Sequence, residues 1–293
     1  MKIGLVGLGR MGSAIAQRLS EQGCTVRGWD VSAEATGALA RAGLQVAKSP
    51  RDAMEGAEVV ISIITEDKGV RRIFTGPDGF LSGDVGGKLF IEMSTLQPMT
   101  GRELAPLVEA KGARLVDSPV LGTIPQVKEG KLFALLGGRA EDVARARGVL
   151  EKLTRRIEHM GPNGAGYAMK LSVNLGLGAY IEALSESLAL GSRQGLAFDQ
   201  MLEVLQEAPY ASNWMKSKIG VLKGEKPAMT LDIRTLRKDI MSAVATGAIS
   251  GVPMPLASGT LAALSAAVAN GYGGGDLAEL AKFVREQMVQ DFA

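Results

Sequence analysis

The sequence predicts an α/β domain built on a doubly wound sheet, followed by an all-helical domain. Three observations support this fold class. Through the first half of the chain, short apolar runs of strand length alternate with helical patterns. A glycine-rich turn joins the first of these runs to the first helix. After Gly161-Pro162-Asn163-Gly164, helical patterns continue to the end with almost no strand signal. We therefore expect two domains, at residues 1–162 and 163–293.

The first thirty residues carry the most specific pattern. Lys2 to Val6 is an apolar run that leads directly into Gly7-Leu8-Gly9-Arg10-Met11-Gly12, a G-x-G-x-x-G motif. Apolar residues then recur at helical spacing, and a second strand from Thr25 to Trp29 ends at Asp30. Strand, glycine turn, helix, strand and acid together form the context of a Rossmann-type dinucleotide site.

Each part of this segment suits a dinucleotide. Gly7 allows the tight turn, Gly9 lets the backbone approach a pyrophosphate, and Gly12 lets the helix pack close to the strand. Free N–H groups at the start of the helix favour the negative charge of a diphosphate. Asp30 can accept hydrogen bonds from the adenosine ribose, whereas a 2′-phosphate there would meet a carboxylate. We therefore predict NAD as the cofactor rather than NADP.

Composition narrows the classes of partner and location. The formal net charge is +2, which indicates neither nucleic acid nor an anionic membrane as a partner. A single cysteine, Cys24, excludes a disulfide framework and suits a reducing cytoplasm. No apolar stretch is long enough to span a bilayer, and no signal peptide is expected before the glycine turn. Because His159 is the one histidine, we expect neither histidine acid/base chemistry nor a metal site.

The remaining elements follow from periodicity. Further strands are expected at Glu58–Ile64, Lys88–Met93, Arg114–Asp117, Leu132–Leu136 and around His159, with helices at 102–111 and 141–153. In the second half, helical patterns cover 165–193, 198–207, 212–223, 235–249, 254–270 and 277–290, and Asp276 can cap the last of them. A cofactor domain followed by a helical domain places the expected active site in the cleft between the two.

Lys170 is the most informative polar residue of the second half. It falls in the early turns of an otherwise apolar helix, where the helix dipole and partial burial would both lower the pKa of its ammonium group. A lysine that loses its proton near neutrality is a competent general acid/base. Asn174 follows one turn later on the same face and could hold a substrate hydroxyl. The alternative is a lysine that reaches into solvent, and spacing alone leaves both interpretations open.

Five segments together resemble the β-hydroxyacid dehydrogenase family, which includes 3-hydroxyisobutyrate dehydrogenase, tartronate semialdehyde reductase and the glyoxylate/succinic semialdehyde reductases. The similarity covers essentially the whole length in the family's order: Gly7 to Gly12, Met93-Ser94-Thr95, Asp117 to Gly130, Gly164-x-Gly166-x-x-x-Lys170-x-x-x-Asn174, and Lys238-Asp239. The resemblance implies that Lys170 is the proton donor or acceptor and that Asn174 orients the substrate. It also implies that the cofactor is contacted by Ile64, Thr65, Thr95 and Lys238.

The segment that in the family receives the substrate's acid group has a different sequence in this chain. Where the family usually has Asp-Ala-Pro-Val-Ser-Gly-Gly, this chain has Asp117-Ser118-Pro119-Val120-Leu121-Gly122-Thr123, followed by Pro125-Gln126 in place of Gly-Ala. Val173 also replaces the first of a pair of asparagines. Substrate contacts are expected from Leu121, Gly122, Thr123, Trp214 and Asp239, with backbone around Gly122 and Thr123 facing the substrate's anionic end. For Trp214 the alternative is ordinary packing in the core of the second domain, and the sequence leaves both interpretations open.

The sequence thus predicts an NAD-dependent oxidoreductase acting on a small 3-hydroxy acid or its semialdehyde, in a cytoplasmic homodimer or homotetramer. One alternative is an imine reductase, which the apolar Leu121 favours and Lys170 disfavours. The other is a dinucleotide-binding protein without turnover, which has no need to keep Lys170 and Asn174 together.

Overall fold

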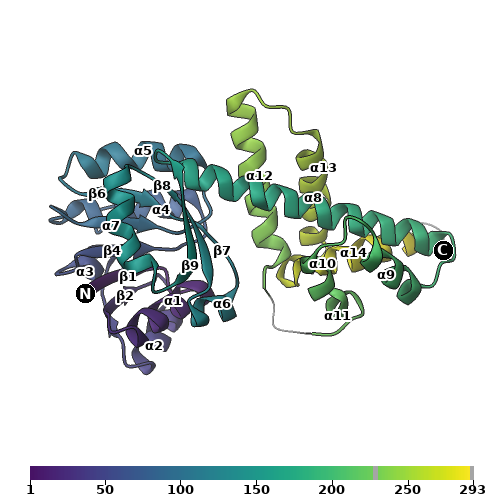
Figure 1. Ribbon diagram of the computed structural model, residues 1–293, viewed down its shortest axis with the longest axis horizontal. Helices are drawn as coiled ribbons and strands as arrows, with labels where there is room; N and C mark the ends of the chain where they lie inside the picture. The colour runs from purple at the N-terminus through teal and green to yellow at the C-terminus, as the bar shows by residue number, and fades with distance from the viewer. Residues whose placement is uncertain (227–229, 291–293) are drawn as a thin grey trace. The chain divides into compact units, whose positions relative to one another are not determined.

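The computed structural model describes residues 1–226 and 230–290, with side chains as far as residue 287 (Figure 1). The chain divides into two compact units, Met1–Leu171 and Ser172–Ala293. This division falls inside helix α8 (Ala165–Arg193), later than the expected domain boundary between residues 162 and 163. The reason is that the first turns of α8 pack with the sheet, where the Tyr167 side chain is 1% exposed.

The first unit contains a nine-stranded sheet with the order β3-β2-β1-β4-β5-β6-β8-β7, to which β9 adds beside β8. The strands are β1 (Lys2–Val6), β2 (Thr25–Trp29), β3 (Gln45–Val46), β4 (Val59–Ser62), β5 (Leu89–Glu92), β6 (Arg114–Asp117), β7 (Val120–Leu121), β8 (Leu132–Gly137) and β9 (Thr154–Gly161). Strands β1 to β6 run parallel, whereas β8 is antiparallel to β6 and β7. The strand order reverses between β1 and β4, the point at which doubly wound sheets bind ligands.

Helices cover both faces of this sheet, because successive strand residues point to opposite sides. Ile3 and Leu5 of β1 belong to a core with α1, whereas Val6 belongs to the opposite core with three mutually packed rings, Phe74, Phe80 and Phe90. The helices of this unit are α1 (Arg10–Glu21), α2 (Ala33–Arg41), α3 (Pro50–Met54), α4 (Asp67–Thr75), α5 (Pro98–Glu109), α6 (Ile124–Glu129) and α7 (Ala140–Leu150), with a short 3-10 helix at Phe80–Ser82. The sequence patterns had not indicated α2, α3, α4 or α6.

The described part of the second unit consists of helices joined by loops, with one isolated β-bridge between Asp232 and Asp276. It contains most of α8, α9 (Phe198–Glu207), α10 (Asn213–Ser217), α11 (Ile219–Leu222), α12 (Ile233–Ser250), α13 (Pro255–Ala269) and α14 (Leu280–Gln290), with 3-10 helices η2 (Tyr272–Gly274) and η3 (Leu277–Glu279). The single helix expected over 212–223 is wrong, because the chain breaks at Lys218, whose ammonium group lies 2.6 Å from the Asp276 carboxylate. Asp276 itself caps η3, the turn that precedes α14.

Among the described residues, no helix combines the length and the apolar character needed to cross a membrane.

Candidate active site

The glycine turn after β1 has the geometry of a pyrophosphate cradle. Gly7 has φ +96°, and a Cβ there would stand 2.0 Å from the carbonyl oxygen of Ile63. A Cβ at Gly12 would stand 1.9 Å from the Gly7 carbonyl oxygen, so neither position accepts a side chain. Around Gly9, by contrast, a Cβ would meet nothing within 4 Å, and no side chain caps the start of α1. These residues therefore fit a dinucleotide, since they leave the helix N-terminus open to a diphosphate.

Asp30 is held against this turn by two backbone donors. Its Oδ2 accepts a hydrogen bond from the N–H of Leu8 at 2.6 Å, and its Oδ1 accepts one from the N–H of Ser32 at 2.8 Å. Arg10 and Met11 open α1 beside them, with Arg10 exposed and Met11 partly buried against the core. The structure therefore brings the predicted acid to the glycine turn, with its position fixed by main chain.

The ends of β4 and β5 meet beside the same turn. The N–H of Ile64 donates to the Ser94 hydroxyl at 2.8 Å, and Ile64 Cγ2 would lie 2.7 Å from a Cβ placed on Gly7. Thr65 is exposed and Thr95 is half-buried in the segments that follow the two strands. The cofactor contacts expected from these two loops thus lie at the edge of the sheet that carries the glycine turn.

Lys170 reaches the segment after β6. Its Nζ donates a hydrogen bond to the carbonyl oxygen of Val120 at 2.9 Å, and its side chain is half-buried. Val120 and Leu121 form β7, so the predicted catalytic lysine lies at the segment in which substrate contacts are expected. The solvent-directed lysine that spacing left open does not match this geometry.

The turn beyond β7 differs from the expectation in one respect. Gly122 has φ +142°, and Leu121 pairs with Phe133 of β8. The N–H of Thr123, expected to face an anion, instead donates to Gln126 Oε1 at 2.7 Å in the capping box of α6. The reason is local: a glutamine three residues after a threonine closes the start of a helix. The Thr123 N–H is therefore already bonded.

In the helical unit, Asn174 is 5% exposed and its Nδ2 donates to Asp239 Oδ2 at 2.6 Å. Lys238 Nζ lies 2.7 Å from the other carboxylate oxygen of Asp239. A carboxylate only accepts hydrogen bonds, so the amide nitrogen of Asn174 must face Asp239 and its oxygen must point elsewhere. Trp214 lies in α10, with its ring packed edge-to-face on Tyr180 at 5.9 Å, rather than in this group.

Two buried carboxylates at the carboxyl ends of neighbouring strands were not expected from the sequence. Glu92 and Asp117, the last residues of β5 and β6, are both fully buried. Burial raises the pKa of Glu92 to about 7 and that of Asp117 to about 6, although hydrogen bonds from hydroxyl and backbone groups oppose the shift. The signal that could have found them is an acidic residue that directly follows buried apolar residues at the end of a strand, as in Leu89-Phe90-Ile91-Glu92 and Leu115-Val116-Asp117.

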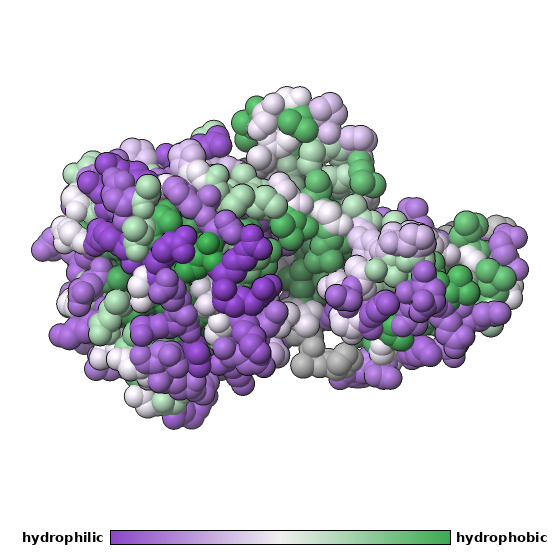
Figure 2. All heavy atoms as spheres, in the orientation of Figure 1, coloured by the Kyte–Doolittle hydropathy of each residue, from purple (hydrophilic) through white to green (hydrophobic). Residues whose placement is uncertain are grey.

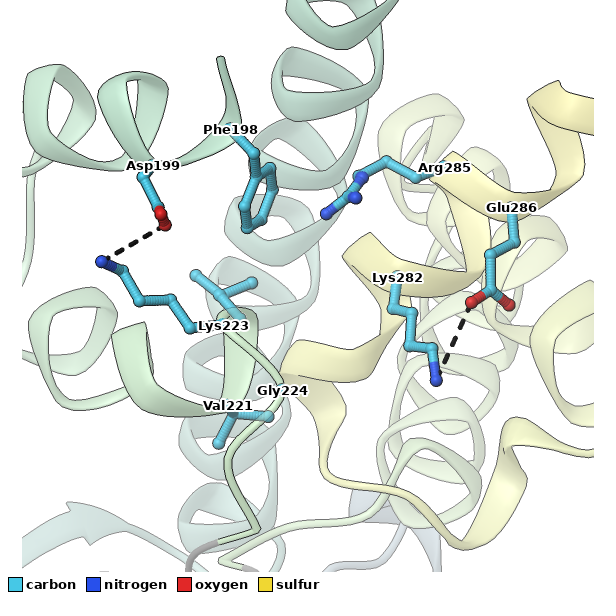
Figure 3. A pocket seen from close by; sticks show the side chains of 9 residues that line it. Phe198, Asp199, Val221, Lys223, Gly224, Lys282, Arg285 and Glu286 are labelled. Atoms are coloured by element: carbon cyan, nitrogen blue, oxygen red, sulfur yellow. Dashed lines mark ion pairs between the residues drawn. The ribbon is translucent and has the colours of Figure 1, made fainter.

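A separate hollow of about 570 Å³ lies in the helical unit (Figure 3). It is lined by Phe198, Asp199, Val221, Leu222, Lys223, Gly224, Lys282, Arg285 and Glu286, none of which is a predicted site residue. Arg285 points toward Phe198, and its guanidinium carbon stands 3.9 Å from the centre of the ring. Within the described part of the chain, no group of three or more His, Cys, Asp or Glu side chains could hold a metal ion.

Comparison with known proteins identifies the family of the chain. A family profile described as the NAD binding domain of 6-phosphogluconate dehydrogenase matches residues 2–161, and one described as NAD-binding of NADP-dependent 3-hydroxyisobutyrate dehydrogenase matches 164–284. The chain is 35% identical to 3-hydroxyisobutyrate dehydrogenase of Pseudomonas aeruginosa over 262 residues, which cover 87% of this chain and 88% of that protein. The chain belongs to the β-hydroxyacid dehydrogenase family.

Other members extend the similarity over nearly the full length. The 2-(hydroxymethyl)glutarate dehydrogenase of Eubacterium barkeri is 28% identical, with 98% of this chain and 96% of that protein covered. The structure of Mycobacterium tuberculosis 3-hydroxyisobutyrate dehydrogenase with L-serine matches with a TM-score of 0.86 at 28% identity, covering 97% of this chain and 99% of that one. As a member of this family the chain is an NAD(P)-binding oxidoreductase that acts on CH–OH donors.

Proposed function

We propose that the protein is an NAD-dependent dehydrogenase that oxidises a small 3-hydroxy acid or reduces the matching semialdehyde. The observation that carries the proposal is Lys170 Nζ, 2.9 Å from the carbonyl oxygen of Val120 in the segment assigned to the substrate acid. Relatives named for 3-hydroxyisobutyrate, L-serine and 2-(hydroxymethyl)glutarate support it. Each of these names describes a hydroxymethyl group on the carbon that bears a carboxylate, and we propose this substrate class here.

In the proposed reaction Lys170 is the general base of oxidation and the general acid of reduction. The turn of Gly7, Gly9 and Gly12 would hold the dinucleotide, which would supply the hydride acceptor for the carbinol carbon. Lys170, in its neutral amine form, would accept the hydroxyl proton, and the Val120 carbonyl would fix the direction of its side chain. Asn174, one turn further along α8, would hold the same hydroxyl through the amide oxygen that Asp239 leaves free.

We propose NAD as the preferred cofactor because the Asp30 carboxylate is anchored at the end of β2 by the N–H of Leu8. A 2′-phosphate would bring a second negative charge against this fixed one. Asp30→Asn removes the charge and keeps an acceptor, so it should raise the NADP-to-NAD ratio of kcat/KM by about tenfold. An unchanged ratio would exclude Asp30 as the source of the preference.

We also propose that the protein works in the cytoplasm as a homodimer or homotetramer. Its single cysteine is buried, and large apolar side chains are exposed at the turn between α12 and α13, where Figure 2 shows hydrophobic residues at the surface. Ile249, Val252 and Leu256 are 68%, 53% and 65% exposed there. A second copy of the chain would cover them. Light scattering after size-exclusion chromatography measures the subunit number, and a monomer would contradict this part of the proposal.

The central test follows nicotinamide absorbance with NAD and NADP over 3-hydroxy acids, semialdehydes and cyclic imines. Lys170→Met should lower kcat by about 10²- to 10⁴-fold while cofactor binding, followed by fluorescence, stays unchanged. Lys170→Arg should lose as much, because arginine keeps the charge but cannot take up a proton. Full turnover by Lys170→Met would exclude the proposed role. Turnover of imines alone would favour the alternative that the apolar Leu121 suggests.

A further inference from the structure

We propose that Glu92 is a positioning residue that ties the loop after β4 to the first turns of α8, and so fixes Lys170 relative to the cofactor-binding turn. This inference rests on the proposed role of Lys170 as general acid/base. It assigns to a buried side chain, remote from the substrate segment, the alignment of the proton-transfer group with the cofactor.

Glu92 is the one charged residue of β5, where it follows Leu89, Phe90 and Ile91 and is fully buried. Both carboxylate oxygens are bonded. Oε2 accepts from the Tyr167 hydroxyl at 2.6 Å and from the N–H of Ser94 at 3.0 Å, and Oε1 accepts from the Ser94 hydroxyl. An apolar side chain would complete the strand at lower desolvation cost, so the carboxylate is explained by the donors that it holds.

One side of this hydrogen-bond network reaches Ile64, in the loop after β4. The Ser94 hydroxyl donates its proton to Glu92 and accepts the N–H of Ile64 at 2.8 Å. Because a hydroxyl has a single proton, its donation to Glu92 leaves an oxygen lone pair directed at Ile64. Ile64 in turn packs beside Gly7, where the pyrophosphate cradle begins. Glu92 therefore sets the position of backbone that borders the dinucleotide site.

The other side of the network reaches α8, the helix that carries Lys170. Tyr167 precedes Lys170 by three residues on α8, so the two side chains leave the helix on neighbouring positions of one face. The Tyr167 ring is 1% exposed and packs beside Gly101 of α5, where a Cβ would be 3.1 Å from Cε2. With its hydroxyl on Glu92, Tyr167 fixes the rotation of α8 about its own axis, and with it the direction of Lys170.

Asp117 holds the same helix at its N-terminus. Its Oδ1 accepts the N–H of Gly164 at 2.7 Å and its Oδ2 accepts the N–H of Tyr167 at 3.3 Å. The contact is close enough that a Cβ on Gly166 would stand 2.8 Å from Asp117 Oδ2. Asp117 thus holds the start of α8, whereas Glu92 sets its rotation, and the two carboxylates end adjacent parallel strands.

The test separates the two sides of the network with two hydroxyl deletions. Tyr167→Phe keeps the buried ring and removes the bond between Glu92 and α8, so kcat should fall about 10- to 100-fold while the Kd for NADH, from fluorescence, changes less than twofold. Ser94→Ala removes the bond to Ile64 and should raise the Kd for NADH several-fold. Glu92→Gln should show both effects. The matched control is Tyr180→Phe, which removes a hydroxyl from the same helix, bonded at 3.3 Å to Met215 Sδ, and should leave both quantities unchanged.

The outcomes distinguish this inference from the function on which it rests. If Lys170→Met abolishes turnover but Tyr167→Phe changes only the melting temperature, Glu92 has a structural role and the inference is wrong. If Lys170→Met keeps full turnover, the proposed function fails first. The positioning role is supported if Tyr167→Phe lowers kcat at unchanged NADH affinity and Tyr180→Phe does not. A general loss of stability would not lower kcat while leaving NADH affinity unchanged.

Discussion

Two buried carboxylates of the sheet unit and two of the helical unit are compensated in different ways. In the sheet unit, Glu92 and Asp117 are held by hydroxyl and backbone N–H groups. In the helical unit, Asp239 and Asp276 each lie against a lysine, Lys238 at 2.7 Å and Lys218 at 2.6 Å. The first arrangement offsets burial with neutral donors, and the second offsets it with an opposite charge.

The two kinds of partner have different consequences for the carboxylates. Neutral donors compensate a buried carboxylate in part, and burial accordingly raises the pKa of Glu92 to about 7 and of Asp117 to about 6. The proton equilibria of these groups therefore fall near neutral pH, beside the helix that carries Lys170. In the helical unit, the pair of Lys218 with Asp276 joins the break after α10 to the turn before α14, where its function is to hold segments together.

The largest expected effect comes from breaking the buried ion pair. Lys218→Met leaves the Asp276 carboxylate without its cation at a site where the side chains are 5% and 7% exposed, and should lower the free energy of unfolding by about 3–5 kcal/mol. Urea denaturation followed by circular dichroism measures it. The matched control is Lys223→Met, whose partner Asp199 stands 3.3 Å away on the surface, with an expected loss below about 1 kcal/mol.

Equal losses for Lys218→Met and Lys223→Met would mean that the buried pair contributes no more than a surface one. A double variant separates the effect of the unpaired charge from that of the altered side-chain shape. Adding Asp276→Asn to Lys218→Met removes the uncompensated charge while keeping an oxygen for the cap on Ala278, so the double variant should be more stable than Lys218→Met alone.

The next effect tests the sheet carboxylates through pH. Because the pKa of Glu92 is raised from 4.5 to about 7, the folded state binds more protons than the unfolded state between these values. The free energy of unfolding should therefore fall by on the order of 3 kcal/mol from this group as pH rises from about 4.5 to about 7. Glu92→Gln should remove this decline, as measured by denaturation at several pH values. Parallel curves for the two proteins would show that Glu92 is not the group responsible.

Local patterns predicted much of this structure. The glycine turn, the strand that ends at Asp30 and the apolar strands each have a signal within a few residues, and so has the long helix that carries Lys170. The family resemblance then supplied the roles proposed for Lys170 and Asn174, which spacing alone leaves open. What the sequence could indicate was therefore the position of each candidate residue along its own element.

Long-range pairing accounts for what was missed. Tyr167 and Glu92 are separated by 75 residues, and Lys218 and Asp276 by 58, so neither partner marks the other in the sequence. For the same reason the break at Lys218 was expected as continuous helix. Thr123 is a different case, because its capping box with Gln126 has a local sequence signature, a threonine followed three residues later by a glutamine. The family resemblance instead assigned the Thr123 backbone to the substrate's anionic end.

The smallest predicted effect compares two helix caps. Asp232 is the N-cap residue of α12, and its Oδ1 accepts the N–H of Thr235 at 2.7 Å. Asp117, by contrast, bonds the start of α8 from β6, which is distant in the sequence. Asp232→Ala should cost about 1 kcal/mol of unfolding free energy, and Asp232→Asn, which keeps an acceptor, much less. Asp117→Asn should instead lower kcat, because one of its two acceptor oxygens becomes a donor facing backbone N–H groups. If both asparagine variants retained full activity, Asp117 would be a local cap like Asp232 and would have no part in placing Lys170.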